Sequence, residues 1–136
     1  MHFGLSEEQE MIVETVRSFV ENEIYPHEET VERTGEVAKE VAEAIKKKTI
    51  DLGFYACNFP QEVGGAGLSH LEFALVEREL GRGAMALNHF FGRPQNILMA
   101  CEGDQKERYL LPAVRGDRMD ALAMTEPGAG SDVRGM

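Results

Sequence analysis

Two segments of the sequence carry the same start signal for an α-helix, and this signal most restricts what the chain can fold into. Ser6 stands three residues before Gln9, and Ser69 stands three residues before Glu72. This is the spacing of a capping box, in which the two side chains satisfy free backbone N–H groups at a helix start. After the first box, apolar residues recur every three or four positions: Ile12, Val16, Phe19, Val20 and Ile24. That spacing is typical of a helix with one buried face.

Further helices are predicted from the same spacing and from helix-ending residues. Pro26 disfavours a helical residue before it, so we expect the first helix to end or bend there. The apolar pattern resumes from Thr34 and ends at Gly53. After the second capping box, the sequence predicts a helix from about His70 to Leu80.

The region before residue 118 contains one interruption and one more helix start. Gly92 and Pro94 split the stretch from Ala84 to Cys101 into two short helices. Asp104 and Glu107 repeat the cap spacing at the start of a last helix, in which Pro112 predicts a kink or an early end. We therefore predict an all-α fold, an up-and-down bundle of about five or six helices, followed by the start of a β-segment at residues 121–125.

Charge and cysteine content exclude several classes of function. The chain has 136 residues and a formal net charge of −10, which disfavours nucleic acid and anionic membranes as partners. Cys57 and Cys101 form neither a disulfide framework nor a zinc-binding pattern, so no metal site is predicted. No signal peptide and no run of apolar residues long enough to span a bilayer is visible, and we expect a cytoplasmic protein.

The glycine-rich segment near the C-terminus is the strongest candidate for a binding site. Gly128 and Gly130 can take positive φ and let the backbone approach a flat ring or a phosphate, while Thr125 and Ser131 add hydroxyls. By spacing alone a plain turn is the favoured interpretation. The third glycine of a GxGxxG motif would fall on Val133, and no Gly-Lys-Ser/Thr sequence occurs.

The complete string Met124-Thr-Glu-Pro-Gly-Ala-Gly-Ser-Asp132 resembles the N-terminal signature of the flavin-dependent acyl-CoA dehydrogenases. Three other blocks are similar to this family in the same order: residues 60–69, with Gly-Gly-Ala-Gly, then Glu77-Arg-Glu-Leu-Gly81, and then residues 103–112. The resemblance runs from about Leu5 to the last residue and covers the family's N-terminal helical domain. It therefore implies a helical domain at residues 1–118 and a truncated start of the middle β-domain at residues 119–136.

The resemblance also implies a reaction and its partners. Family members hold FAD between a helical N-terminal domain, a β-domain and a C-terminal bundle, and remove two hydrogens from an acyl-CoA thioester. They pass the electrons to electron-transfer flavoprotein and form dimers or tetramers. The family's catalytic base lies in or near the C-terminal bundle, so no catalytic residue is assigned here. The 136-residue chain alone is expected to be inactive.

Individual site residues follow from the matched positions. The resemblance places Leu122, Met124 and Thr125 beside the flavin ring, although position 122 is often Tyr in the family. Gly130 and Ser131 would close the loop near FAD, and Ser131 would also reach the CoA part of the substrate. Glu126 is interpreted as an acceptor that fixes the turn. Residues 88–91, Asn-His-Phe-Phe, fall where family members line the acyl pocket, but core packing is favoured for Phe90 and Phe91.

Other functions stay open at this point. The loop indicates a flavin-binding site and does not distinguish a dehydrogenase from an acyl-CoA oxidase, a nitroalkane-oxidising enzyme or an enoyl-CoA reductase. A different class is a non-catalytic, acidic helical interaction module, which would retain no flavin. We also expect the chain alone to self-associate, because Leu122 and Met124 present apolar side chains in the terminal segment.

Overall fold

The computed structural model describes residues 4–135. Within this range the chain forms six α-helices: α1 (Glu7–Phe19), α2 (Tyr25–Thr34), α3 (Lys39–Asp51), α4 (His70–Leu80), α5 (Met85–Asn88) and α6 (Leu111–Val114). Two π-helical stretches, Val20–Ile24 and Lys106–Leu110, precede α2 and α6. Short 3-10 turns lie at Gln61–Val63, His89–Phe91, Asn96–Ala100 and Val133–Gly135. The all-α prediction is confirmed.

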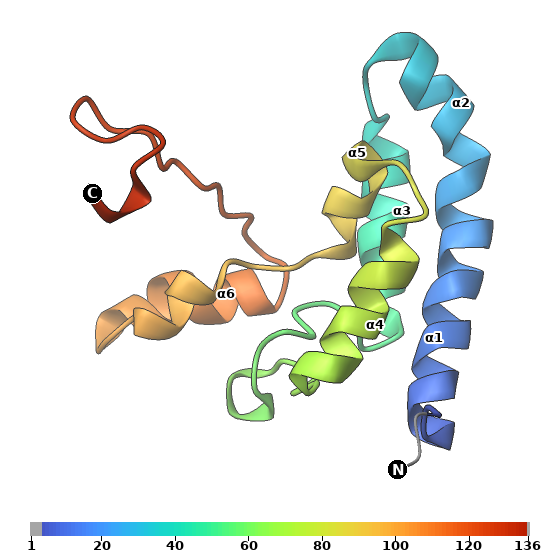
Figure 1. Ribbon diagram of the computed structural model, residues 1–136, viewed down its shortest axis with the longest axis horizontal. Coiled ribbons are helices and arrows are strands. Elements are labelled where there is room, and N and C mark those ends of the chain that lie inside the picture. Colours follow the sequence, from blue (N-terminus) through green and yellow to red (C-terminus); the bar gives the residue numbers. More distant parts are fainter. Residues whose placement is uncertain (1–3, 136) are drawn as a thin grey trace.

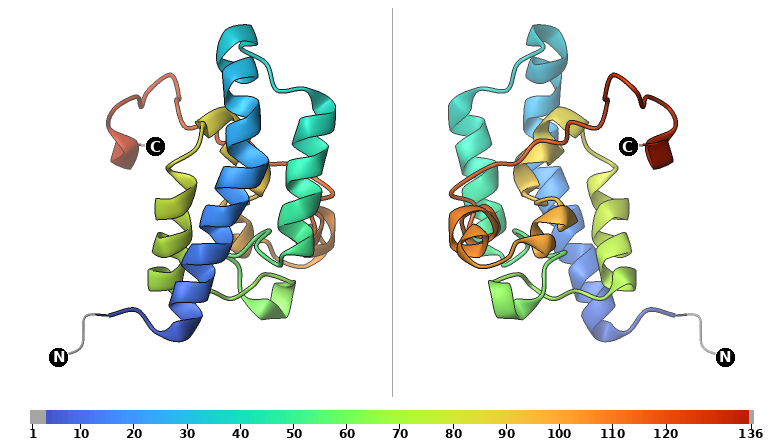
Figure 2. Two further views of the ribbon diagram at one scale, coloured as in Figure 1. Left: turned by 90° about the vertical axis from the view of Figure 1, so that its right-hand side faces the viewer. Right: turned by 90° about the vertical axis from the view of Figure 1, so that its left-hand side faces the viewer.

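The helices form a bundle with a projecting C-terminal segment (Figure 1). α1 and α2 form one long helical rod, and α3 and α4 lie alongside it (Figure 2). The turn at Asn96–Ala100 and α6 extend to one side, and the chain after α6 projects from the helical body. Across residues 4–135, the predicted β-segment at residues 121–125 forms no strand, and an isolated antiparallel bridge, Glu126–Ala129, follows it. A strand needs hydrogen bonds to a neighbouring backbone, and residues 121–125 make none with the described part of the chain.

The sequence predicts an end or a bend of the first helix at Pro26; the helix does not end there, because the helical rod continues through this residue. Pro26 lies in the first turn of α2, where a missing backbone N–H leaves no gap in the hydrogen-bond pattern. α2 ends where Gly35 takes a left-handed conformation with φ of 72°. The next helix therefore starts at Lys39 rather than at Thr34.

Both predicted capping boxes are present. Gln9 N donates to Ser6 Oγ at 3.2 Å and Ser6 N donates to Gln9 Oε1 at 3.1 Å. Ser69 and Glu72 make the same exchange at 3.3 Å and 2.7 Å, and α4 spans His70–Leu80 as predicted. The hydrogen bond with Ser69 lowers the pKa of the Glu72 carboxyl, because the carboxylate accepts it.

The predicted cap at Asp104 is wrong. Asp104 already lies within the helical turn, and the bond at this helix start runs from Glu102 N to Gln105 Oε1 at 3.0 Å. The chain enters the helix early because Gly103 turns it with φ of 49°. Pro112 lies in the first turn of α6, after the π-helical stretch.

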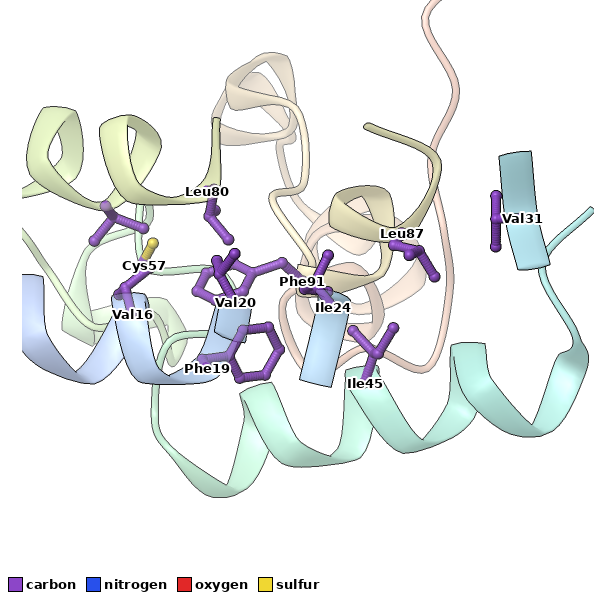
Figure 3. Close-up of a cluster of buried hydrophobic side chains, with 11 residues drawn as sticks. Val16, Phe19, Val20, Ile24, Val31, Ile45, Cys57, Leu80, Leu87 and Phe91 are labelled. Carbon is purple, nitrogen blue, oxygen red and sulfur yellow. The ribbon is translucent and has the colours of Figure 1, made fainter. Parts of the chain in front are cut away.

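The main core lies between the rod, α3, α4 and α5 (Figure 3). Phe19 and Phe91 meet edge to face, with ring centroids 5.3 Å apart and an angle of 84° between the rings. The fully or almost fully buried side chains around them are Val16, Val20, Ile24, Ile45, Cys57, Val76, Leu80 and Leu87. Figure 3 shows these side chains converging from separate elements, so this core fixes α5 relative to α1 and α4.

A buried carboxylate joins α1 to α4. Glu79 is only 2% exposed, yet it accepts hydrogen bonds from Arg17 Nε at 3.0 Å and Arg78 Nε at 2.9 Å, and Arg82 lies 3.8 Å away. The hydrogen bond from Arg17 lowers the pKa of Glu79 against the opposing effect of burial. The carboxylate is therefore ionised at neutral pH and holds the two helices together.

Two polar side chains fix the start and the end of α5. Glu28 Oε1 accepts a hydrogen bond from Ala84 N at 2.6 Å, although it comes from the distant helix α2. Asn88 Nδ2 donates to Leu80 O at 2.5 Å and to Gly83 O at 2.9 Å. These bonds satisfy backbone groups at the ends of short elements and orient α5.

Candidate functional site

A cavity of about 470 Å³ opens beside α4 and α5, and we call it the α4–α5 pocket. α4 contributes Phe73 and Glu77 to its wall, while Met85 and His89 come from α5 and the turn after it. The rest of the wall comes from three other segments: Tyr55 and Asn58, residues 92–96, and Met119 with Asp120. Its size lies within the range of small-molecule sites.

The connection Gly92-Arg93-Pro94 shapes one wall of the pocket. Gly92 has φ of 83°, and a Cβ at this position would lie 1.8 Å from Cε2 of Tyr55. Only glycine lets the Tyr55 ring pack against this backbone. Ala56 N donates to Gly92 O at 2.9 Å, and Asn58 Nδ2 donates to Pro94 O at 2.9 Å, so the connection is held on both sides of Arg93.

An ion pair lies in this wall. Arg93 Nη1 donates to Glu77 Oε1 at 2.6 Å and also contacts Glu77 Oε2. The side chain of Arg93 is 27% exposed and that of Glu77 is 39% exposed, so a ligand in the pocket could reach both. The pair offers a ligand N–H donors and carboxylate acceptors in the same place.

Three further polar groups complete the pocket. Burial raises the pKa of Tyr55, and the charges of Asp120 and Asp117 add to this, so the phenol keeps its proton at neutral pH. Asp120 Oδ2 accepts a hydrogen bond from Gln95 N at 2.7 Å, which ties the terminal segment to the pocket. Asn58 Oδ1 is buried and has no hydrogen-bond partner within residues 4–135.

The residues predicted to contact a flavin lie together in the projecting terminal segment, away from the pocket wall. The structure leaves Leu122 63% exposed and Met124 39% exposed, and Thr125, Gly130 and Ser131 are also exposed. Met119 and Asp120, a few residues earlier, line the pocket. The roles of the five residues at a flavin and of Ser131 at CoA stay predictions.

The glycine-rich segment is a closed turn with open faces. Glu126 N donates to Ala129 O at 3.1 Å, and Ala129 N donates to Glu126 O at 3.2 Å. The turn is therefore closed by the backbone of Glu126 and not by its carboxylate. Gly128 and Gly130 do not take positive φ, and a Cβ at either position would meet no described atom within 4 Å. The turn is preformed and leaves free space at both glycines.

Residues 88–91 divide between the core and the pocket. Phe91 is fully buried in the core and Phe90 packs against it, which confirms the predicted core packing of both rings. Asn88 is 5% exposed, donates to backbone carbonyls and does not line the α4–α5 pocket, so its implied place at an acyl group stays a prediction. His89 is the member of this group that lines the pocket.

The described residues 4–135 contain no group of three or more side chains suited to holding a metal ion. Cys57 and Cys101 are free thiols. No helix in this range is long and apolar enough to cross a membrane.

Comparison with known families decides the ancestry of the chain. The family described as "Acyl-CoA dehydrogenase, N-terminal domain" matches residues 6–117. The chain belongs to the acyl-CoA dehydrogenase family. Within this family, the matched range contains all six α-helices and every lining residue of the α4–α5 pocket except Met119 and Asp120.

Relatives in the acyl-CoA dehydrogenase family include both reductases and dehydrogenases. The 3-(aryl)acrylate reductase of Clostridium sporogenes is 35% identical over 132 residues, covering 93% of this chain and 34% of the relative. The benzylmalonyl-CoA dehydrogenase of Aromatoleum aromaticum is also 35% identical, over 98% of this chain and 36% of the relative. The chain thus spans about a third of the length of these relatives.

A solved structure shows the same fold. The acyl-CoA dehydrogenase of Bacillus anthracis, crystallised with FAD, is 28% identical, with a TM-score of 0.74 over 97% of this chain and 23% of that chain. This likeness agrees with the helical architecture of the family's N-terminal domain.

The sequence did not indicate five of the polar pocket residues: Tyr55, Asn58, Glu77, Arg93 and Asp120. They come from separate segments, and only the core packing brings them together. The one local signal was Gly92-Arg93-Pro94, in which a glycine and a proline flank a charged residue.

Proposed function

We propose that this chain is the N-terminal domain of an FAD-dependent acyl-CoA dehydrogenase, an enzyme that removes one hydrogen each from Cα and Cβ of an acyl-CoA thioester. In this proposal residues 1–118 form the helical domain and residues 119–136 begin the middle domain. The observation that carries it is the preformed turn at Glu126–Ala129, inside the family's signature. In the sequence, this turn follows closely after Met119 and Asp120, which line the α4–α5 pocket.

The terminal segment fits a flat ring system. Leu122 and Met124 are two residues apart, which places their side chains on one face of an extended segment. Gly128 and Gly130 leave space for close backbone approach, and the hydroxyls of Thr125 and Ser131 can donate or accept hydrogen bonds. FAD, when bound, would supply the hydride acceptor. The residues of this chain would position its ring and exclude water from one side.

The α4–α5 pocket fits the acyl part of a thioester. Phe73, Met85 and Met119 give it apolar surface, and the Arg93–Glu77 pair adds polar groups at one wall. Ser131 would contact the CoA part. Met85 is 88% exposed, and the bound ligand or another part of the protein would cover it.

This domain is assigned no base for the α-proton. A base must lie within hydrogen-bond reach of that proton and have a suitable pKa. We therefore propose that the 136-residue chain alone has no turnover, that the complete protein forms a dimer or tetramer, and that electron-transfer flavoprotein accepts its electrons.

The test uses the product of the complete reading frame that contains this chain. We expect it to purify with bound flavin, to lose flavin absorbance when an acyl-CoA is added without oxygen, and to regain it with electron-transfer flavoprotein. Thr125→Ala should lower flavin occupancy, whereas Thr30→Ala, an exposed threonine of α2, should leave it unchanged. A protein without flavin would support the interaction module instead. Turnover by residues 1–136 alone with FAD, an acyl-CoA and a dye acceptor would contradict the proposal that this domain has no turnover by itself.

An enoyl-CoA reductase is a second candidate, because one relative is named as a reductase of 3-(aryl)acrylate. The same flavin seat would then deliver hydride to a double bond. Two parallel experiments distinguish them: chemically reduced protein is mixed with an enoyl-CoA, and oxidised protein is mixed with an acyl-CoA. Fast flavin oxidation by the enoyl-CoA, together with no flavin reduction by the acyl-CoA, would favour the reductase over the dehydrogenase.

A further inference from the structure

We propose that the Arg93–Glu77 pair makes the α4–α5 pocket selective for an acyl group that carries a hydroxyl, rather than for a plain alkyl chain or a chain ending in a carboxylate. This inference rests on the proposed function, because it takes the ligand of the pocket to be the acyl part of a CoA thioester. It names Arg93 and Glu77 as specificity-determining residues.

The hydrogen bonds of the Arg93 guanidinium are one-sided. Within residues 4–135, its hydrogen bonds run from Nη1 to Glu77, and Nε and Nη2 have no partner there. A guanidinium carries five N–H donors in a planar fork, so most remain available to a ligand. The oxygens of Glu77 have further lone pairs, and this side chain is 39% exposed. One small group could therefore accept from Arg93 and donate to Glu77.

The charges around the pocket argue against a carboxylate. Among the described residues that line the pocket, Arg93 carries a positive charge against the carboxylates of Glu77 and Asp120, and His89 adds an imidazole. A carboxylate on the ligand would share one guanidinium with Glu77 and approach a second acid. A hydroxyl is neutral and combines donor with acceptor, so both members of the pair can bond to it.

A plain alkyl chain also fits poorly against this wall. It would remove water from the free N–H groups of Arg93 and from the oxygens of Glu77 without replacing those hydrogen bonds. Asn58 also lines the pocket, and its acceptor Oδ1 already has no hydrogen-bond partner among the described residues. A polar ligand group would form hydrogen bonds with this wall and leave no further buried polar atom without a partner.

The pair is not needed to hold the chain in place. The hydrogen bonds of Gly92 O with Ala56 N and of Pro94 O with Asn58 Nδ2 already fix the backbone on both sides of Arg93. A partly exposed ion pair adds little to stability by itself. Its place in the pocket wall is better explained by contact with a ligand.

The test measures dissociation constants by calorimetry with three ligands: hexanoyl-CoA, its terminal-hydroxyl derivative and its terminal-carboxylate derivative. The CoA part is the same in all three, so a difference between their dissociation constants reports on the terminal group. With the product of the complete reading frame, we expect the hydroxyl ligand to bind at least about tenfold more tightly than the other two. A factor of this size corresponds to the contribution of one hydrogen-bonding group.

Variants assign the preference to the pair. Arg93→Met should bring the ratio of the hydroxyl and alkyl dissociation constants close to one, and Glu77→Gln should reduce it, with unchanged helical circular dichroism. Arg115→Met is the matched control, because Arg115 pairs with Asp117 outside this pocket. Equal binding of the three ligands by the unmodified protein, tightest binding of the carboxylate, or the same loss for all ligands in Arg93→Met would overturn the inference. A hydroxyl preference in a protein without flavin would refute only the proposed function, whereas flavin reduction without ligand preference would refute only this inference.

Discussion

Replacing Glu79 by Gln tests whether the buried carboxylate joins α1 to α4. The substitution keeps the size of the side chain and removes its charge. It also turns an –NH₂ group toward arginine N–H donors, so that donors face each other where a carboxylate had accepted two short hydrogen bonds. The effect should therefore be electrostatic and not a result of lost packing.

The expected magnitude follows from the burial of the partners. A hydrogen bond to a charged group contributes about 1.5–3 kcal/mol. Glu79 accepts two hydrogen bonds at 3.0 Å or less, from Arg17 Nε and Arg78 Nε, and a longer one of 3.4 Å from Arg17 Nη2. The side chains of Arg17 and Arg78 are 42% and 54% exposed, so water replaces part of what they lose. We expect Glu79→Gln to lower the free energy of unfolding by about 2 kcal/mol, or the Tm by roughly 6 °C for a domain of this size.

Urea and thermal unfolding followed by circular dichroism measure this difference. Glu43→Gln is the matched control, because its carboxylate pairs with Lys39 in an i,i+4 contact and its side chain is 67% exposed. We expect this control to change stability by less than about 0.5 kcal/mol.

The pH dependence gives a second criterion. The pKa of Glu79 is lowered in the folded chain, chiefly by the hydrogen bond from Arg17. Its contribution is therefore complete above the unfolded pKa of about 4.3 and is lost as the pH falls through the folded pKa. The gap between wild type and Glu79→Gln should be constant from pH 7 to pH 5 and close below that range. A gap as wide at pH 3 as at pH 7, or a variant as stable as the Glu43→Gln control, would refute the reasoning.

Three other predictions concern the backbone, the thiols and association. Gly92→Ala should lower the free energy of unfolding by at least about 2 kcal/mol, because the new Cβ would collide with Tyr55. Gly103→Ala meets no neighbour and should lower it by about 1 kcal/mol, from its left-handed φ alone. Chemical denaturation of the two variants measures this difference. Burial raises the pKa of Cys57 to about 11, so iodoacetamide at pH 8 should modify Cys101 first. Cys57 should react only as fast as the fold opens around it, and equal labelling rates of the two thiols would contradict this. The chain alone should self-associate through the exposed apolar side chains of its terminal segment, and sedimentation that shows a strict monomer over a wide concentration range would count against it.

Local signals predicted the fold well where the decisive contacts lie within a few residues. Both capping boxes and the span His70–Leu80 follow from side chains that bond to their own helix start. Pro26 misled the prediction because its effect depends on whether it falls in a first turn, which the preceding π-helical stretch decides. The cap expected at Asp104 failed because Gly103 turned the chain one residue earlier.

The candidate site divides in the same way. The terminal turn could be found from the sequence because its residues are consecutive. The pocket could not, because Arg93 meets Glu77 only when the core brings α4 against the segment after α5. No periodicity links residues separated by 16 positions in this manner.

The extended run from Ala121 to Thr125 has a consequence for any chain that comes to lie beside it. None of its backbone N–H or C=O groups is hydrogen-bonded within residues 4–135, so the run offers an open sheet edge. A neighbouring segment could pair with this edge while the run keeps its conformation. The hydrogen bond from Gln95 N to Asp120 Oδ2 would then fix where the new sheet begins relative to the helices. Side chains alternate along such a sheet, so Leu122 and Met124 would face one side of it, and Ala121, Ala123 and Thr125 would face the other.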